Sequence, residues 1–184
     1  RITSDLPDAI ESAELIVLAI PSQYLRSVLR GLRGVLDPHA AILSVAKGIE
    51  LRTLKRMSQV VAEELGRVRL AVLSGPNIAS EIASGHPASS VVASSIPGLA
   101  ERLQHALMDE RLRIYTSSDV IGVELGGALK NPIAIAAGIG DGLGFGANAK
   151  AALVTRGLVE IARLGAAMGA REEPFWGLSG LGAL

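Results

Sequence analysis

The sequence contains no cysteine. This absence excludes disulfide bonds, thiolate metal sites and a cysteine nucleophile, and it fits a protein of a reducing compartment. The three histidines, His39, His86 and His105, stand far apart and lack the spacing of metal ligands. We therefore expect them at the surface, and we expect no metal site.

The chain also has no net charge, because 18 lysines and arginines balance 18 aspartates and glutamates. Without an overall positive field, neither nucleic acid nor an anionic membrane is an expected partner. An anionic ligand would have to meet a local cluster of cations. The composition, with 49% hydrophobic and 20% charged residues, is that of a globular protein.

Long apolar runs are missing as well. The longest, at 15–20 and 133–139, are far shorter than the ~20 residues that a membrane helix needs, so we expect no membrane span. The chain starts without methionine and without the basic and then apolar layout of a signal peptide. These features favour a cytoplasmic location, and we expect both ends to continue in a longer protein.

Nucleotide-binding α/β domains usually have a Gly-x-Gly-x-x-Gly turn that brings backbone amides to the pyrophosphate, and this motif is absent too. The glycine-rich segment 138–146 does not have this spacing and follows a helical stretch. We interpret it as a mobile or tightly packed connection between two helices, in preference to a phosphate loop.

Short runs rich in Val, Ile and Leu alternate with helical patterns in the first half of the chain. This alternation predicts an α/β fold with a parallel sheet and crossover helices. The predicted strands are 15–20, 40–45, 70–73, 90–93 and 113–115. Helices are expected from Gln23 after the Pro21-Ser22 cap, from the Thr53 cap to Leu65, and from Pro97 to Met108.

After Ser118 the pattern is helical throughout. Asp119 can cap a helix through Glu124 and Lys130, and Asn148 can cap a second helix. One apolar face of the second helix would contain Val154, Leu158, Ile161 and Met168. The expected fold is therefore a partial doubly wound (Rossmann-like) parallel sheet in residues 1–117, followed by an all-α domain in 118–184.

Two segments that follow predicted strands are candidates for ligand binding, because ligands of open parallel sheets lie at the carboxyl ends of the strands. Lys47, in Ala46-Lys47-Gly48, is placed to meet an anion, although a solvated surface lysine is the alternative. The segment 74–81 contains Gly75 and Asn77 and predicts a tight turn into a helix, with Asn77 as its cap. An ordinary capped turn is the alternative there.

Lys130 lies among small or apolar neighbours that offer its ammonium group little water. Desolvation and a second cation such as Lys47 both favour the uncharged amine, the form that a general base needs. A lysine that extends to the surface is the alternative. Pro132 should remove a helical hydrogen bond and bend the chain beside Lys130.

Several runs, taken together, resemble one family. They are Ala46-Lys47-Gly48, Leu-Ser-Gly-Pro-Asn-Ile-Ala at 73–79, Val-Glu-Leu-Gly-Gly-Ala-Leu-Lys-Asn at 123–131, Asp-Gly-Leu-Gly-Phe-Gly at 141–146, Lys-Ala-Ala-Leu at 150–153 and Gly-Leu-Ser-Gly-Leu-Gly at 177–182. Their order and spacing resemble the NAD(P)-dependent glycerol-3-phosphate dehydrogenases over nearly the whole chain. The resemblance implies an oxidoreductase that interconverts sn-glycerol 3-phosphate and dihydroxyacetone phosphate by hydride transfer with NAD or NADP, supports phospholipid synthesis and forms a homodimer.

The resemblance also implies roles for single residues and for the two parts of the chain. Residues 1–117 would be the C-terminal part of the NAD(P)-binding domain, and 118–184 would begin the substrate domain. The implied roles are proton transfer for Lys130, assistance to it for Asn131, substrate binding for Lys47, Gly75 and Asn77, and cofactor binding for Lys47, Ala79 and Pro21.

Three positions depart from the family pattern. Ala183 stands where the family usually has a substrate-binding or catalytic aspartate, Pro132 where valine is common, and Ala147 where aspartate is common. Two other functions stay open: a reductase of another small hydroxy acid on the same fold, or a non-catalytic binding protein that retains the scaffold. We expect the 184 residues alone to be inactive.

Overall fold

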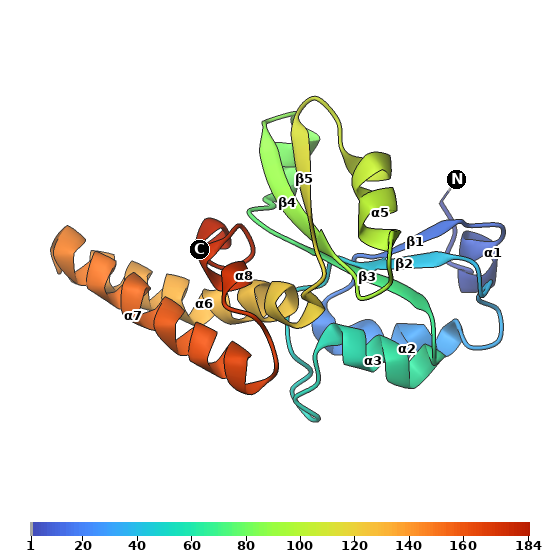
Figure 1. The fold of residues 1–184 in the computed structure, drawn as a ribbon, viewed down its shortest axis with the longest axis horizontal. Coiled ribbons are helices and arrows are strands. Elements are labelled where there is room, and N and C mark those ends of the chain that lie inside the picture. The colour runs from blue at the N-terminus through green and yellow to red at the C-terminus, as the bar shows by residue number, and fades with distance from the viewer. Residues whose placement is uncertain (1) are drawn as a thin grey trace.

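The computed structural model describes residues 2–184 and places a five-stranded sheet beside a long helical hairpin (Figure 1). The strands lie side by side in their sequence order. They are β1 (Leu15–Leu18), β2 (Ala41–Ser44), β3 (Arg69–Ser74), β4 (Ala88–Ala93) and β5 (Leu112–Ser117). All five lie within a few residues of their predicted positions, and the expected fold class, an α/β sheet followed by helices, is confirmed.

One strand pair corrects the prediction of a purely parallel sheet. β3 and β4 are antiparallel, with Val72 opposite Ala93, whereas the other three pairs are parallel. The chain between them contains only the five-residue α4 (Ala79–Ala83) and returns at the edge where β3 ends. A return at the same edge makes the two strands antiparallel. As a result, β4 begins beside the carboxyl end of β3.

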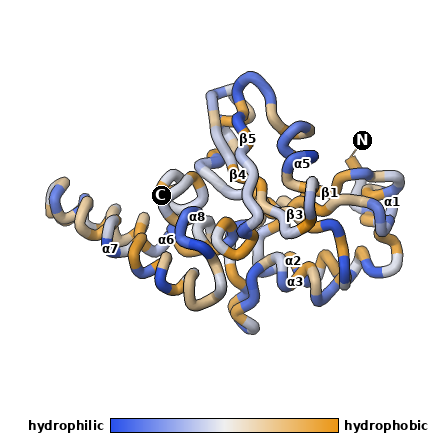
Figure 2. The backbone as a smooth tube through the Cα atoms, in the orientation of Figure 1, coloured by the Kyte–Doolittle hydropathy of each residue, from blue (hydrophilic) through white to orange (hydrophobic). Residues whose placement is uncertain are grey.

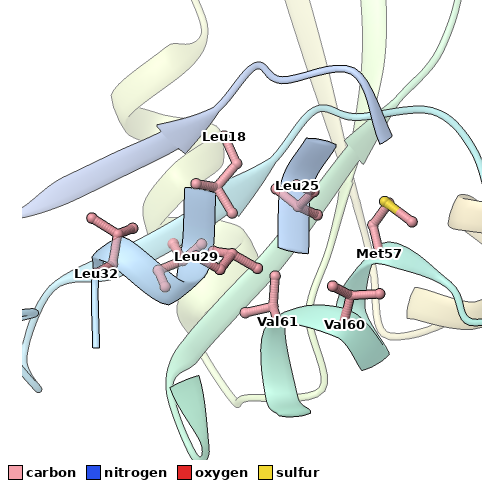
Figure 3. Packing of buried hydrophobic residues seen from close by; sticks show 8 residues of the cluster. Leu18, Leu25, Leu29, Leu32, Met57, Val60 and Val61 are labelled. Atoms are coloured by element: carbon pink, nitrogen blue, oxygen red, sulfur yellow. The ribbon is translucent and has the colours of Figure 1, made fainter. Parts of the chain in front are cut away.

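Helices cover both faces of the sheet (Figure 1). On one face, α2 (Ser22–Gly31) and α3 (Met57–Leu65) pack on β1 and β2, and Figure 3 shows their leucines, valines and Met57 in contact. On the other face, α5 (Leu99–Leu107) packs on alternate residues of the strands, such as Leu43 and Ile114. Each fully buried leucine or valine in these layers contributes about 1.5–3 kcal/mol.

The start of α3 differs from the prediction. The helix begins at Met57 and not after Thr53. The hydroxyl of Thr53 donates to the carboxylate of Glu50 and accepts from the amide of Lys55 at 3.3 Å, so it belongs to the loop before the helix. Ile49 and Arg56 form an antiparallel bridge that closes this loop. Arg56 therefore becomes the residue that precedes the helix.

The second half of the chain is an antiparallel pair of long helices, α6 (Val120–Gly142) and α7 (Gly146–Ala167). Asp119 caps α6 as predicted, since its Oδ1 accepts from the amide of Gly122 at 2.9 Å. α7 starts two residues before the predicted Asn148. β5 ends at Ser117, and the division of the chain into two domains there stays a prediction.

The glycine-rich connection is shorter than predicted. α6 continues without interruption through Pro132 and as far as Gly142, so that only 143–145 join the two helices. Gly138 and Gly142 have open space around them and adopt helical geometry. A positive φ occurs in this segment at Gly144 and Gly146, where the chain reverses.

A separate core joins the hairpin to the end of the chain. Phe175 of α8 (Glu173–Trp176) is fully buried against Leu125 and Ile161. The predicted apolar face of α7 is present in Val154, Leu158 and Ile161, whereas Met168 is about one-third exposed at the helix end. The short α1 (Leu6–Ile10) and the 3-10 turn η1 (Leu181–Ala183) lay outside our predictions.

By length and composition, α6 is the one helix in residues 2–184 that could cross a membrane. We did not predict it, because no long run of consecutive apolar residues marks it; alanines and glycines supply much of its apolar character. The core helix of a soluble protein passes the same test, and α6 packs on β3, α7 and α8. At the far end of the hairpin, hydrophobic and hydrophilic segments interleave (Figure 2), and Ile135, Ile139 and Phe145 are exposed.

Candidate functional site

Lys47 and Gly75 meet at the carboxyl ends of neighbouring strands. Lys47 follows β2 by three residues, Gly75 directly follows β3, and the two strands are parallel. The ammonium group of Lys47 donates to the carbonyl oxygen of Gly75 at 2.7 Å. Gly75 has a φ of +152°, and a Cβ there would lie 2.9 Å from the carbonyl oxygen of Ser89. This turn therefore requires glycine.

Asn77 serves a different purpose from the helix cap that we predicted. Ile78 is the residue that precedes α4, and the Oδ1 of Asn77 accepts from the hydroxyl of Ser90 at 2.6 Å. Ser90 comes within reach because antiparallel β4 begins at the end of β3. This contact holds the segment that follows Gly75 against the sheet.

A cleft of about 690 Å³ opens at these strand ends. Four of the predicted site residues line it: Pro21, Lys47, Asn77 and Ala79. The other lining residues are Ala19, Ile20, Val45, Ala46, Leu73, Ile82, Ala83, Ser90 and Leu112. Among these described residues Lys47 is the one charged side chain. An apolar cleft with one cation and a few polar groups suits an anionic molecule with an apolar part, as a dinucleotide is.

Two adjacent glycines bring α6 to this site. A Cβ on Gly127 would lie 2.3 Å from the Oγ of Ser74 and 3.6 Å from the Cγ of Lys47. A Cβ on Gly126 would lie 2.9 Å from the carbonyl oxygen of Ser179. Glycine at both positions lets the helix touch the end of β3 on one side and the C-terminal turn on the other. Lys130 follows less than one helical turn later.

Lys130 and Lys47 share one electrostatic environment. Burial lowers the pKa of Lys47, and the positive charge of Lys130 lowers the pKa of Lys47 further. The ammonium group of Lys130 donates to the carbonyl oxygen of Ala183, whose side chain is buried in η1. The structure thus brings together the two lysines that the sequence singled out.

Other residues that the sequence singled out are exposed or form separate contacts. Asn131 and Pro132 are exposed on α6. Asp141 and Lys150, both from the family-like runs, form an ion pair of 2.6 Å where the hairpin turns. The three histidines are exposed, and no group of three His, Asp or Glu side chains in residues 2–184 is placed to hold a metal ion.

Two features of the site were missed at the level of sequence. Ser90 lies in a serine-rich strand with no local sign of its bond to Asn77. Glu124 belongs to the run that contains Lys130, but its partners, Arg56 and Ser58, are more than 60 residues away and in a different element. Neither contact produces a periodic or spaced signal that sequence reasoning can use.

The fold and the site define a class of protein. A mostly parallel sheet with a cleft at the carboxyl ends of its strands is typical of nucleotide-binding α/β enzymes. In this chain the helical segment adds a second lysine, whose charge acts on Lys47 of the cleft. Residues 1–100 match the N-terminus of NAD-dependent glycerol-3-phosphate dehydrogenase, and residues 119–184 match its C-terminus. The chain belongs to the NAD-dependent glycerol-3-phosphate dehydrogenase family.

Individual relatives agree with this assignment. The chain is 52% identical to glycerol-3-phosphate dehydrogenase [NAD(P)+] 2 of Salinibacter ruber over 187 aligned positions, which cover 100% of this chain and 54% of the relative. It is 48% identical to the glycerol-3-phosphate dehydrogenase [NAD(P)+] of Clostridium perfringens, covering 98% of this chain and 54% of the relative. The chain therefore spans about half the length of the curated relatives it matches.

Solved structures support the same family. The crystal structure of glycerol-3-phosphate dehydrogenase from Coxiella burnetii superimposes with a TM-score of 0.92 and 40% identity, covering 98% of this chain and 55% of that one. A ketopantoate reductase from Ralstonia eutropha superimposes with a TM-score of 0.53 and 16% identity. The second likeness shows a shared fold alone, and so it does not favour the alternative of another hydroxy-acid reductase.

Proposed function

We propose that the full-length protein interconverts sn-glycerol 3-phosphate and dihydroxyacetone phosphate with NAD or NADP. The observation that carries the proposal is that Lys47 lines the strand-end cleft and has the positive charge of Lys130 near it, in a chain from this family. The substrate is an anion, and the carbonyl oxygen gains negative charge when hydride reaches it. Two cations that lie close together stabilise both charges.

In this proposal Lys130 is the general acid and base. It takes the proton from the C2 hydroxyl during oxidation and returns it during reduction, and Asn131 assists it. NAD or NADP, when bound, supplies the acceptor or donor of the hydride. The bond from Lys130 to the carbonyl of Ala183 supports the assignment, because it holds the side-chain nitrogen in a fixed position.

The other residues orient the ligands. Lys47 contacts both substrate and cofactor, Gly75 and Asn77 contact the substrate, and Pro21 and Ala79 contact the cofactor. Their shared place at the cleft supports these roles: Pro21, Lys47, Asn77 and Ala79 line it, and the carbonyl of Gly75 is bonded to Lys47.

The biological setting follows from the family. We infer a cytoplasmic homodimer that supports phospholipid synthesis, with an NAD(P)-binding domain up to residue 117 and a substrate domain after it. The balanced charge, with 18 cationic and 18 anionic residues, supports a small-molecule partner and not nucleic acid.

The test is kinetic. The full-length protein should reduce dihydroxyacetone phosphate with NADH or NADPH, and Lys130→Ala should lower kcat by about 10²–10⁴-fold, the usual contribution of general acid–base catalysis. Reduction of ketopantoate but not of dihydroxyacetone phosphate would contradict the proposal. If the full-length protein turned over neither substrate, the non-catalytic binding protein, which Ala183 in place of the family aspartate favours, would stand instead.

A further inference from the structure

Glu124 is a buried carboxylate that links two elements far apart in the sequence. Its side chain is 7% exposed, although it belongs to α6 among apolar and small neighbours. It accepts from the amide of Ser58 at 2.7 Å, from the hydroxyl of Ser58 at 2.6 Å, and from the guanidinium group of Arg56. We call this set of three residues the Glu124 contact.

The Glu124 contact restrains the start of α3. Ser58 is the second residue of α3, so Glu124 satisfies an amide that has no partner within that helix. Removing one member of a buried, hydrogen-bonded ion pair leaves the other uncompensated, which is costly. The pair is a weak source of net stability, but it fixes where α6 lies relative to α3.

Arg56 connects the Glu124 contact to the segment that contains Lys47. It forms the antiparallel bridge with Ile49, which lies two residues after Lys47. Ile49 also packs against the core that contains Leu125 of α6. The segment 47–49 is therefore attached to α6 at two points, of which the Glu124 contact is the polar one.

Lys130 lies further along the same helix, near the middle of α6. It follows Glu124 by six residues, about 9 Å along a helix axis. Two ammonium groups that lie close together repel each other, so the protein has to hold their segments in place against this repulsion. The Glu124 contact is well placed for this purpose because it touches neither lysine.

We propose that Glu124 is a positioning residue that holds α6 against the segment of Lys47 and so sets the distance between Lys47 and Lys130. The kinetic part of this inference rests on the proposed function, whereas the structural part does not.

The chain contains four lysines, Lys47, Lys55, Lys130 and Lys150, so their titration can be followed separately. We would label the lysines of the 184-residue chain with ¹³C, assign the four signals by single Lys→Arg variants and titrate each by NMR. Glu124→Ala should raise the pKa of Lys47 toward its ordinary value, because Lys130 moves away and water enters. Glu124→Gln, which keeps an acceptor oxygen, should raise it less.

The direction in which the pKa of Lys47 changes distinguishes a positioning role of Glu124 from a purely electrostatic effect of its charge. Loss of the negative charge of Glu124 without movement would lower the pKa of a nearby lysine, and the unpaired Arg56 would lower it further. A fall, or no change, in the pKa of Lys47 in Glu124→Ala therefore overturns the proposal. If this variant does not fold, Glu124→Gln decides by the same criterion: a rise supports the proposal, and no change or a fall overturns it.

Asp119→Ala is the matched control. Asp119 also holds the first turns of α6, through the amides of Gly122 and Arg171, and it bonds to nothing on α3 in the described residues. Loss of this cap costs about 0.5–2 kcal/mol and loosens the helix start in general. The pKa of Lys47 should stay unchanged in this variant. An equal rise there would show that any loosening of α6 suffices, and would overturn a specific role for Glu124.

In the full-length protein, Glu124→Ala should lower kcat by roughly ten- to a hundredfold, because a misplacement of about 1 Å can cost 10²-fold. KM for glycerol 3-phosphate should change by less than about twofold. A raised KM with unchanged kcat overturns the kinetic part. If the full-length protein itself does not act on glycerol 3-phosphate, the proposed function fails, while the lysine titration still tests the Glu124 contact.

Discussion

At the scale of single residues, the site depends on positions that carry no side chain. Gly75 allows the turn after β3, Gly126 lets α6 touch the backbone of Ser179, and Gly127 lets it touch the side chain of Ser74. Lys47 and Lys130 can share one environment because nothing larger than hydrogen separates their segments at Gly127. The position of α6 beside the segment of Lys47 therefore depends on glycine.

Gly127→Ala tests this point. The new Cβ would lie 2.3 Å from the Oγ of buried Ser74, so we expect a loss of about 1–3 kcal/mol in the free energy of unfolding. Gly138→Ala is the control, because this helical glycine has no atom within 4 Å of the new Cβ, and there we expect a gain of up to about 1 kcal/mol. Urea unfolding measures both, and equal stability of the two variants would contradict the packing.

At the scale of elements, α2 and α3 are joined by charge as well as by their apolar core. Arg26 of α2 bonds to Glu50 at 2.8 Å and to Glu64 of α3 at 2.6 Å. These hydrogen bonds to Arg26 lower the pKa of Glu50 to about 2 and also lower the pKa of Glu64. Because Glu50 lies between Lys47 and α3, the network also anchors the loop that joins them.

This network predicts a loss of stability in acid. The pKa of Glu50 in the folded protein lies below the ordinary value of about 4.3, so its contribution is present above that value and disappears as pH falls toward about 2. Between pH 5 and pH 3 the urea midpoint should fall less in Glu50→Gln than in the natural chain. Glu14→Gln is the control, since Glu14 is 89% exposed in its pair with Arg102 and should leave the pH dependence unchanged. An unchanged slope in Glu50→Gln would refute the prediction.

Packing between α7 and its neighbours also relies on glycine. A Cβ on Gly165 would lie 2.1 Å from the ring of Phe175, and one on Gly157 would lie 2.6 Å from Ile133. These two positions let α8 and α6 pack closely on α7. The C-terminal turn, with the Ala183 carbonyl that accepts from Lys130, is held in place by this core.

At the scale of the whole molecule, the chain holds the strand-end cleft and the lysine pair but no Gly-x-Gly-x-x-Gly turn. We therefore expect the 184 residues, purified alone, to show no reduction of dihydroxyacetone phosphate by NADH or NADPH above background. Absorbance of the reduced nucleotide at high protein concentration measures this. An ordinary kcat, about 1–10³ s⁻¹, would show that the missing turn is dispensable.

Much of the fold follows from the sequence because its signals are local. Strand and helix periods, the Asp119 cap and the Pro21 turn depend on neighbours a few residues away, and they located five strands and the main helices. Boundaries shifted where polar side chains form a loop, as at Thr53, whose hydroxyl bonds to Glu50 and to the amide of Lys55 before α3 begins. The glycines of 138–142 looked like a connection, yet they continue α6.

The sequence by itself determined the family, because membership depends on residue types in a fixed order, and the same order singled out the two lysines as candidates for the site. Tertiary structure alone decided that β4 runs antiparallel, that Ser90 bonds to Asn77, that Lys130 bonds to the Ala183 carbonyl, and that Glu124 joins α6 to α3. Apart from the strand direction, these are contacts between residues 13 to 68 positions apart. Such contacts form only when the packed sheet and helices bring distant segments together, and so no local pattern of residues in the sequence predicts them.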